Sequence, residues 1–433
     1  MAKKTCADAA ETTSIGHASE CSTTLDTDNE VDVAAIRRQF PIFANHPDVV
    51  FFDNAATSQK PASVLRRLSQ FYRRDCANAG RSSYRAATKA AGDIEKARKR
   101  VAALINAESA DLVFTSGATE SLNTVALAWG LANLKHGDEI MVCYGDHKSC
   151  VLPWLNLKAL LARFGIEVKI VPIAIHTDGD YDRKDIAKSL SARTRLIAIT
   201  HVHHLYGSDM EVAQVRESIG PDVLISLDAS QSIGHRRVDV KDLPVDFLSF
   251  SGHKMFAGGG VGVLWVSPKV QDSLCTIKAG GMTPVYRHSE IVGGETLADK
   301  LECGTQNIAS IISLIPAIDF IEKLGLEKIK RRVSRLCQKL RDELASIAGI
   351  EFAPGFSSYG CPVGFGIVSF RFEQIATSDL AFLLDSENIQ VRTGDHCIAA
   401  RHAGDDYVRV SLHVYNTEEE IERFLAVLKA NLL

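Results

Sequence analysis

The stretch VDFLSFSGHKMFAGGGVGVLWV, from Val245 to Val266, decides how this part of the chain folds. Two apolar runs, each typical of a buried strand, flank Ser-Gly-His-Lys and a glycine tract. Lysine is rarely buried without a partner, yet Lys254 lies between two segments that are predicted to be core. A lone lysine after a strand is usually a surface residue. A functional role for Lys254 therefore depends on which residues lie at the ends of the other predicted strands.

Similar apolar runs, mostly β-branched, recur through the first two thirds of the chain and alternate with segments of helical spacing: VVFFD, DLVFTS, DEIMVC, VKIVPI, TRLIAIT and DVLISLDAS. This alternation predicts an α/β fold with a mostly parallel sheet covered on both faces. After about residue 309, a long helical stretch leads to separated strands and a final helix. That change predicts a second, smaller α+β domain.

Composition excludes several classes of function. The chain has 433 residues, which is too long for one compact core, and its 46% hydrophobic and 24% charged content is that of an ordinary globular protein. A net charge of −4 without a basic block argues against nucleic acid or an anionic membrane as the main partner. No apolar run approaches the roughly 18–20 residues that a membrane helix needs.

Residues 1–30 are rich in Ser, Thr, Ala and Asp, and we expect them to form a disordered tail. The tail contains several acidic residues and no arginine, which argues against a transit peptide. The ten cysteines form neither a C-x-x-C pair nor a dense framework, and no secretory segment is visible. The expected location is therefore cytoplasmic, with reduced thiols.

Several chemically active residues fall at predicted strand ends, where ligands bind in open α/β sheets. The strand predicted within DVLISLDAS ends on Asp228, and His147 follows the one within DEIMVC. Gly117–Thr119 follow LVFTS, and Lys254 follows FLSFS. Pyridoxal phosphate needs an amine that holds it as a Schiff base and an acid near its pyridine nitrogen. It also needs an anion cradle at a helix N-terminus. Each residue alone could be a cap or a turn residue; their joint occurrence predicts this cofactor, with His147 stacked on its ring.

DASQSIGH together with SFSGHK resembles the fold-type I pyridoxal-phosphate enzymes of the class V aminotransferase group, and most closely the SufS-like (type II) cysteine desulfurases. The blocks FFDNAATSQKP, LVFTSGATESLN, GDHKSCVLPW, KLECGTQN and VRTGDHC extend the resemblance from about Ile36 to the end. It implies a large domain with a mostly parallel seven-stranded sheet between helices and a smaller α+β C-terminal domain. The expected ranges are 1–30 for the tail, 31–48 for a segment packing on the small domain, 49–308 for the large cofactor-binding domain and 309–433 for the small C-terminal domain.

The resemblance also implies residue roles. Lys254 holds the cofactor, Asp228 faces the pyridine nitrogen, Gln231 contacts the ring hydroxyl, and His147 stacks and shuttles protons. The phosphate contacts are expected from Ala118, Thr119, Ser251 and His253. Thr305 would reach the phosphate of the other subunit's cofactor, which implies a homodimer. Substrate binding is expected from Arg409, Arg392 and Asn54.

Cys397 is the candidate nucleophile. Most single cysteines are structural, but this one has the polar neighbours Asp395 and His396 and lies between two arginines in sequence, and positive neighbours make thiolate available. The stretch also resembles the persulfide-forming segment of type II desulfurases. The implied reaction converts L-cysteine to L-alanine, with a persulfide on Cys397 that passes to a sulfur acceptor.

The sequence departs from the family pattern around the expected substrate. His203-His204 stand where the family usually has a small residue and an Asn that bonds the cofactor's ring oxygen, so His204 is expected to bind the cofactor. Residues Asn78–Ala87 also differ from the usual segment. Without further ligands at suitable spacing, the His pair does not predict a metal site. An amino-acid epimerase, a C–S or C–Se lyase, and a non-enzymatic binding protein on the same scaffold stay open as alternatives.

Overall fold

The computed structural model describes residues 31–79, 83–176, 179–281, 286–287, 290–291, 296–354, 365–400 and 406–432. The predicted tail, residues 1–30, lies outside these ranges, as does part of the segment Asn78–Ala87. The described residues belong to one compact unit, Val31–Leu433. Within them, no helix is long and apolar enough to span a bilayer.

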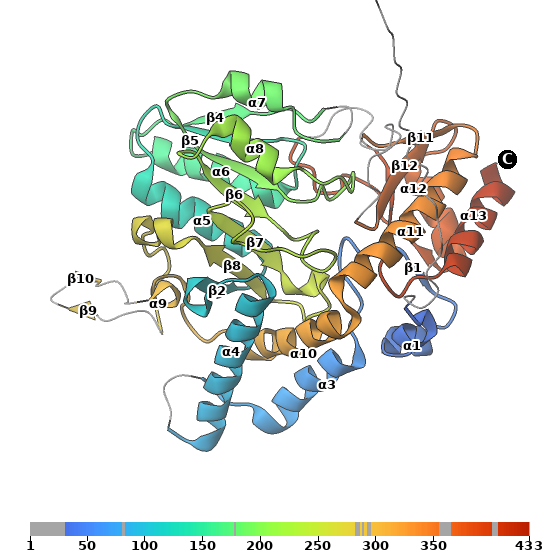
Figure 1. The fold of residues 1–433 in the computed structure, drawn as a ribbon, viewed down its shortest axis with the longest axis horizontal. Helices are drawn as coiled ribbons and strands as arrows, with labels where there is room; N and C mark the ends of the chain where they lie inside the picture. Colours follow the sequence, from blue (N-terminus) through green and yellow to red (C-terminus); the bar gives the residue numbers. More distant parts are fainter. Residues whose placement is uncertain are drawn as a thin grey trace, which may run out of the picture. The chain divides into compact units, whose positions relative to one another are not determined.

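Within the described residues, seven strands form the central sheet in the order β2-β8-β7-β6-β5-β3-β4 (Figure 1). Their bounds are β2 Leu112–Thr115, β3 Glu139–Val142, β4 Lys169–Pro172, β5 Thr194–Thr200, β6 Leu224–Asp228, β7 Phe247–Ser251 and β8 Gly262–Val266. The pairs from β7 to β4 are parallel, and only β8 runs antiparallel to its two neighbours. This arrangement confirms the predicted, mostly parallel seven-stranded sheet.

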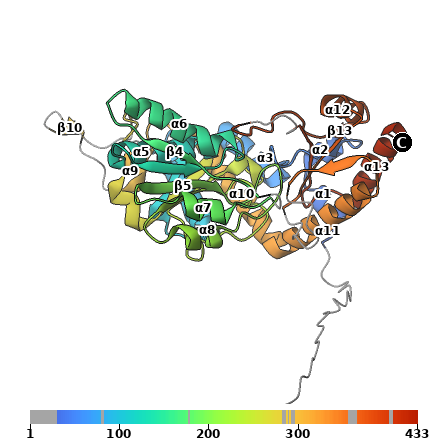
Figure 2. The ribbon, with the colours of Figure 1, turned by 90° about the horizontal axis from the view of Figure 1, so that it is seen from above.

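Helices cover both faces of this sheet because successive strand residues point in opposite directions. In β5, Leu196 and Ala198 pack with α5 and α6, whereas Ile197 and Ile199 pack on the opposite side. Figure 2 shows α5 and α6 on one side of β4 and β5, and α7 and α8 on the other. The helices around the sheet are α3 Ala62–Gln70, α4 Arg85–Leu104, α5 Ala118–Asn133, α6 Lys148–Ala162, α7 Arg183–Ser189, α8 Val212–Ile219 and α10 Ile308–Leu324.

The C-terminal elements form the predicted smaller α+β part. Strands β11 (Ile350–Phe352), β12 (Ile367–Phe372) and β14 (Val408–Ser411) make an antiparallel sheet. Helices α11 (Leu326–Ala345), α12 (Thr377–Ser386) and α13 (Glu418–Leu432) share one apolar cluster with these strands. A separate short pair joins β1 (Val50–Phe51) in parallel to β13 (Ile389–Gln390).

The remaining elements are short. They are α1 Val33–Arg37, α2 Pro41–Asn45, the π-helical turn η2 Phe71–Asp75, the 3-10 turns η3 Ser109–Asp111, η4 Gly252–Lys254 and η5 Pro268–Ser273, the hairpin β9 Tyr286–Arg287 with β10 Glu290–Ile291, and α9 Leu297–Leu301.

The packing of β1 and α10 bears on where the large and small domains divide. Val50 and Phe52 lie in the apolar cluster of the C-terminal part, while α10 contributes Ile311 and Leu314 to the core beneath the large sheet. We therefore propose that the large domain begins after Phe52 and continues to Gly325, between α10 and α11. The segment 31–48 contacts both parts, since Phe40 packs on Phe256 and on Tyr415.

Candidate active site

A cavity of about 180 Å³ lies where β3, β5, β6 and β7 end; we call it the Lys254 cavity. The parallel strands bring their carboxyl ends to one edge, which collects residues far apart in sequence. The predicted residues that line it are Ala118, Thr119, His147, His204, Asp228, Gln231, Ser251, His253, Lys254, Arg392 and Arg409. The structure thus brings most of the predicted site together.

Lys254 follows β7 in the turn η4 and is half-buried at the cavity. Burial lowers the pKa of its amine to about 8, against the opposing effect of Asp228, which favours the charged form. An amine with a lowered pKa gives up its proton more readily near neutrality, which suits a nucleophile or a general base.

Asp228 is buried at the end of β6, and the backbone around it fixes its direction. Its Oδ1 accepts a hydrogen bond from Ser230 N at 2.9 Å. Gln231, one turn later, donates from Nε2 to the Ala55 carbonyl at 2.9 Å. The carboxylate and the amide therefore enter the cavity from one short segment after a single strand.

The N-terminus of α5 forms one side of the cavity. Gly117 precedes the helix in extended conformation, and Ala118 N donates to Ser251 Oγ at 2.8 Å. The hydroxyls of Thr119 and Ser149 are 2.8 Å apart. Backbone N–H groups at a helix start, together with hydroxyls, make a cradle suited to a phosphate group.

The adjacent histidines 203 and 204 have different environments. His203 is buried and accepts at Nδ1 from the amides of Leu205 and Tyr206, while its Nε2 donates to the Gly145 carbonyl at 3.1 Å. His204 is also buried, but within the described residues neither of its ring nitrogens has a partner. Burial holds the pKa of His204 well below its usual value, so the ring is neutral. The ring nitrogens of His203 are therefore both bonded to the backbone, whereas those of His204 have no partner, in the described part of the chain, at the cavity that this residue lines.

His147 begins α6, where its Nδ1 accepts from Ser149 N at 3.1 Å. Its ring is perpendicular to that of His204, with 5.1 Å between the ring centres. Burial, assisted by the nearby Lys254, lowers its pKa to about 4. In the part of the chain that the structure describes, no group of three or more His, Cys, Asp or Glu residues could hold a metal ion.

Cys397 lies on a short loop beside the cavity and is half-buried. The Arg392 guanidinium donates from Nη2 to its Sγ at 3.3 Å. The loop is tied to the start of α6, because Lys148 N donates to the Cys397 carbonyl at 2.7 Å and Lys148 Nζ pairs with Asp395 Oδ2 at 2.5 Å. His396 and Cys397 both have positive φ angles, 44° and 60°, which are uncommon for residues other than glycine.

Three predicted residues do not line the Lys254 cavity: Cys397 lies beside it, and Asn54 and Thr305 have other surroundings. The amide of Asn54 is consumed by internal bonds, with Nδ2 donating to the Ser411 carbonyl at 2.6 Å and Oδ1 accepting from the Tyr415 hydroxyl. Its surroundings favour a structural role over the expected substrate contact. Thr305 is exposed and lines a different hollow of about 200 Å³, together with Glu120 and Lys278.

Sequence reasoning missed several residues of the cavity: Ala55, Ala56, Ser149, Thr200, Ser230 and His396. Thr200 and Ser230 lie at or next to the ends of the predicted strands TRLIAIT and DVLISLDAS. The rule that the carboxyl ends of parallel strands meet at one edge therefore also predicts that they lie at the cavity. Ala55 and Ala56 carried no signal, because small apolar side chains reveal nothing about the ligand that they contact.

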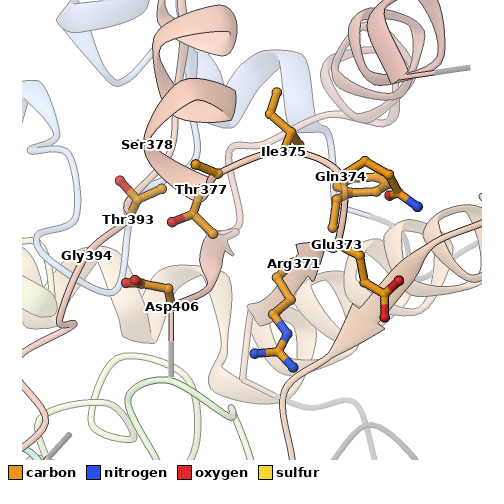
Figure 3. Close-up of a pocket in the computed structure, with 11 residues that line it drawn as sticks. Arg371, Glu373, Gln374, Ile375, Thr377, Ser378, Thr393, Gly394 and Asp406 are labelled. Carbon is orange, nitrogen blue, oxygen red and sulfur yellow. The ribbon is translucent and has the colours of Figure 1, made fainter. Parts of the chain in front are cut away.

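A larger cavity of about 450 Å³ lies in the C-terminal part, between the start of α12 and the segment at Thr393 and Gly394 (Figure 3). Figure 3 shows Arg371, Thr377 and Asp406 around it. None of the predicted site residues lines it. Its size alone does not make it the reactive centre, because the amine, the acid and the anion cradle all meet at the smaller cavity.

Comparison with known proteins agrees with this geometry. The model of the family described as "Aminotransferase class-V" matches residues 50–424. A cysteine desulfurase of Pectobacterium atrosepticum is 33% identical over 408 residues, which cover 92% of this chain and 97% of the relative. The apo structure of a cysteine desulfurase from Thermococcus onnurineus is similar with a TM-score of 0.83 and 31% identity, covering 92% of this chain and 97% of that one.

The cysteine desulfurase CsdA of Escherichia coli is similar with a TM-score of 0.81 and 26% identity, covering 93% of this chain and 98% of that one. Matches of this extent include both the large sheet and the C-terminal part. The chain belongs to the class-V aminotransferase family.

Proposed function

We propose that this chain is a pyridoxal-phosphate-dependent cysteine desulfurase that forms a persulfide on Cys397. The observation that carries the proposal is the contact of the Arg392 guanidinium with Cys397 Sγ at 3.3 Å, beside the cavity that contains Lys254. Relatives named cysteine desulfurase, one of them 33% identical over 92% of this chain, support the assignment. In the reaction, L-cysteine and the Cys397 thiol become L-alanine and a Cys397 persulfide, so a C–S bond is replaced by a C–H bond and a new S–S bond forms.

The residues of the Lys254 cavity fit pyridoxal phosphate. Lys254 would hold the aldehyde carbon, Asp228 the pyridine nitrogen, and the start of α5 with Ser251 the phosphate. The unpartnered ring nitrogens of His204 support this fit, because a buried polar atom without a partner is costly unless a ligand supplies one. When bound, the cofactor draws electrons away from the α-carbon of the amino acid.

The chain's own residues would then place and move protons. Lys254, with a pKa of about 8, removes the α-proton of the substrate and later returns a proton to the product. Asp228 would hold the pyridine nitrogen of the cofactor and favour its protonated form. His147, whose pKa of about 4 leaves its ring neutral, would stack on the cofactor ring and shuttle a proton there.

Arg409 is the proposed clamp for the substrate carboxylate. It is buried, with Nη1 donating to the His204 carbonyl at 3.0 Å and Nη2 paired with Asp53 at 2.9 Å. Its Nε has no partner within the described residues, and the side chain lines the cavity. A guanidinium held in this way offers a preorganised donor to an incoming carboxylate.

Sulfur transfer is assigned to Cys397 because it is the half-buried thiol next to a cationic donor. The Arg392 guanidinium donates to the sulfur of Cys397 and so fixes the position of that atom beside the cavity. The persulfide sulfur would then pass to an acceptor protein.

We also propose a homodimer in which Thr305, exposed on its own chain, reaches the neighbouring subunit's site. Sedimentation of the holoenzyme tests the dimer, and a Thr305→Asp variant should bind the cofactor more weakly. The cytoplasmic location stays a prediction from the pattern of cysteines.

The test uses purified holoenzyme with L-cysteine and a reductant, with alanine and sulfide quantified. Cys397→Ala should lose about a hundredfold or more in alanine formation while still binding the cofactor. Cys76→Ala, at an exposed thiol, is the matched control and should retain activity. Mass mapping should place the persulfide on Cys397.

Full alanine formation by Cys397→Ala would contradict the transfer step and favour a C–S lyase. Recovery of D-amino acid without alanine would instead favour an epimerase.

A further inference from the structure

Lys60 is a half-buried lysine that the proposed reaction leaves unused. It lies in the segment Thr57–Lys60, just before α3. Its ammonium donates to the His253 carbonyl at 2.9 Å, to Thr57 Oγ1 at 3.2 Å and to the Ser58 carbonyl. All of these acceptors are neutral oxygens, and within the described ranges no carboxylate pairs with Lys60.

Burying the Lys60 ammonium without a carboxylate partner costs folding free energy. A lysine that leaves water without a counter-charge loses hydration that neutral acceptors replace only in part. The cost is visible in the pKa of Lys60, which burial lowers to about 8. Other cations in the chain avoid it: Arg98, for example, is buried but pairs with Glu302 at 2.8 Å.

The acceptor that Lys60 binds is the carbonyl of the peptide leading directly into Lys254. The same oxygen lies 3.1 Å from Ser58 N, 3.1 Å from Ser58 Oγ and 3.1 Å from Thr57 Oγ1. Donors from one short segment therefore converge on a single carbonyl, which restricts how the peptide between His253 and Lys254 can rotate.

The far side of the turn is held by the same segment. Phe256 N donates to Ser58 Oγ at 2.9 Å, and Phe256 has a φ of 70°, in a region that bulky residues rarely adopt. A backbone in this conformation persists only where its surroundings impose it. Residues 57–60 therefore hold the turn both before and after Lys254.

We propose that Lys60 is a positioning residue: its ammonium fixes the peptide between His253 and Lys254, so that the Lys254 amine is directed into the cavity. Lys60 does not line the cavity itself, and it acts on the reaction only through Lys254. The inference rests on the proposed function, in which Lys254 carries the cofactor and moves the α-proton.

The test compares Lys60→Met with Lys339→Met in the holoenzyme. Lys339 is the matched control because it pairs with a carboxylate, Glu422, at 2.7 Å on the outside of α11. The first measurement is thermal unfolding. The others, made well below the unfolding temperature, are kcat and KM for L-cysteine and the pH midpoint of the visible absorbance of the cofactor bound to Lys254.

For Lys60→Met we expect kcat to fall between about tenfold and a hundredfold, as for a reacting group misplaced by about 1 Å, with KM unchanged within about twofold. The pH midpoint should rise by about half a unit, since a Lys254 amine that is no longer held in place loses part of the burial that lowers its pKa. Lys60→Arg keeps the charge and several donors, and it should recover part of kcat. Lys339→Met should behave as the wild type.

Wild-type kcat and an unchanged pH midpoint in a folded Lys60→Met protein would overturn the proposal and leave Lys60 a purely structural residue. Should Lys60→Met fail to fold, Ser58→Ala removes the bonds to the His253 carbonyl and to Phe256 N, and it must show the same pattern of falling kcat and rising midpoint. If the wild type forms no alanine, the proposed function fails, but the absorbance midpoint still tests Lys60.

Discussion

Replacing Gly262 by alanine should disturb the anion cradle at the start of α5, although Gly262 lies on a different element, β8. Gly262 pairs with Thr115 where β8 lies beside β2. A Cβ at Gly262 would lie 2.4 Å from Gly117 C, 2.5 Å from Gly117 Cα and 2.6 Å from Thr115 Oγ1. Two of these contacts are to backbone atoms, which cannot rotate away as a flexible side chain can.

The size of the effect follows from these distances. Carbon atoms in contact prefer about 3.5 Å, so Gly117 and the start of α5 must move by about 1 Å. Forcing an extra methyl group into a well-packed site costs about 1–3 kcal/mol of unfolding free energy. We expect a cost near the upper limit of this range, about 3 kcal/mol, because the clash is with backbone atoms. Since a displacement of about 1 Å at a reacting site can cost a hundredfold, we expect the affinity for pyridoxal phosphate to fall at least about tenfold.

Gly259→Ala is the matched control, because a Cβ at Gly259 would meet nothing within 4 Å. Its unfolding free energy should change by less than about 0.5 kcal/mol. Urea unfolding of both variants and titration of the apoprotein with pyridoxal phosphate check the reasoning. If Gly262→Ala matches Gly259→Ala in both measurements, the proposed coupling between the strand pair and the phosphate cradle is wrong.

Three further outcomes are expected. Arg392→Gln should slow alkylation of Cys397 by iodoacetamide several-fold at neutral pH, because the guanidinium that donates to the sulfur is lost; an unchanged rate would contradict the role of this contact. Burial lowers the pKa of His235 to about 4, so between about pH 4 and 6.5 the unfolded chain binds more protons than the folded one, and the unfolding free energy decreases as the pH falls through this range. Between pH 7 and pH 4.5, His235→Gln should remove about 2.4 kcal/mol of that decrease in urea unfolding, and an unchanged decrease would speak against it. Arg98→Met should cost about 3 kcal/mol in thermal or urea unfolding, since it leaves the Glu302 carboxylate without its cation at 2.8 Å; a loss below about 1 kcal/mol would refute this.

Much of the fold was accessible from local sequence pattern. Apolar runs such as TRLIAIT predicted strands, and in β5 their alternate residues face the two helical layers as period-2 geometry requires. The C-terminal change in pattern predicted the smaller α+β part. The pattern did not predict that β1 belongs to the C-terminal part, where it pairs with β13. A short strand carries no information about which distant strand it will pair with.

The sequence by itself determined which residues meet at the Lys254 cavity wherever they lie at or just after the ends of parallel strands, as Asp228 and Lys254 do. Position in sequence then implies position in space, since parallel strands share one carboxyl edge. Only the tertiary structure decided that the His203 ring is consumed by backbone hydrogen bonds, and that the Asn54 amide is consumed by Ser411 and Tyr415. The direction of a side chain in an irregular loop depends on contacts from distant segments, and periodicity along the chain does not encode those contacts.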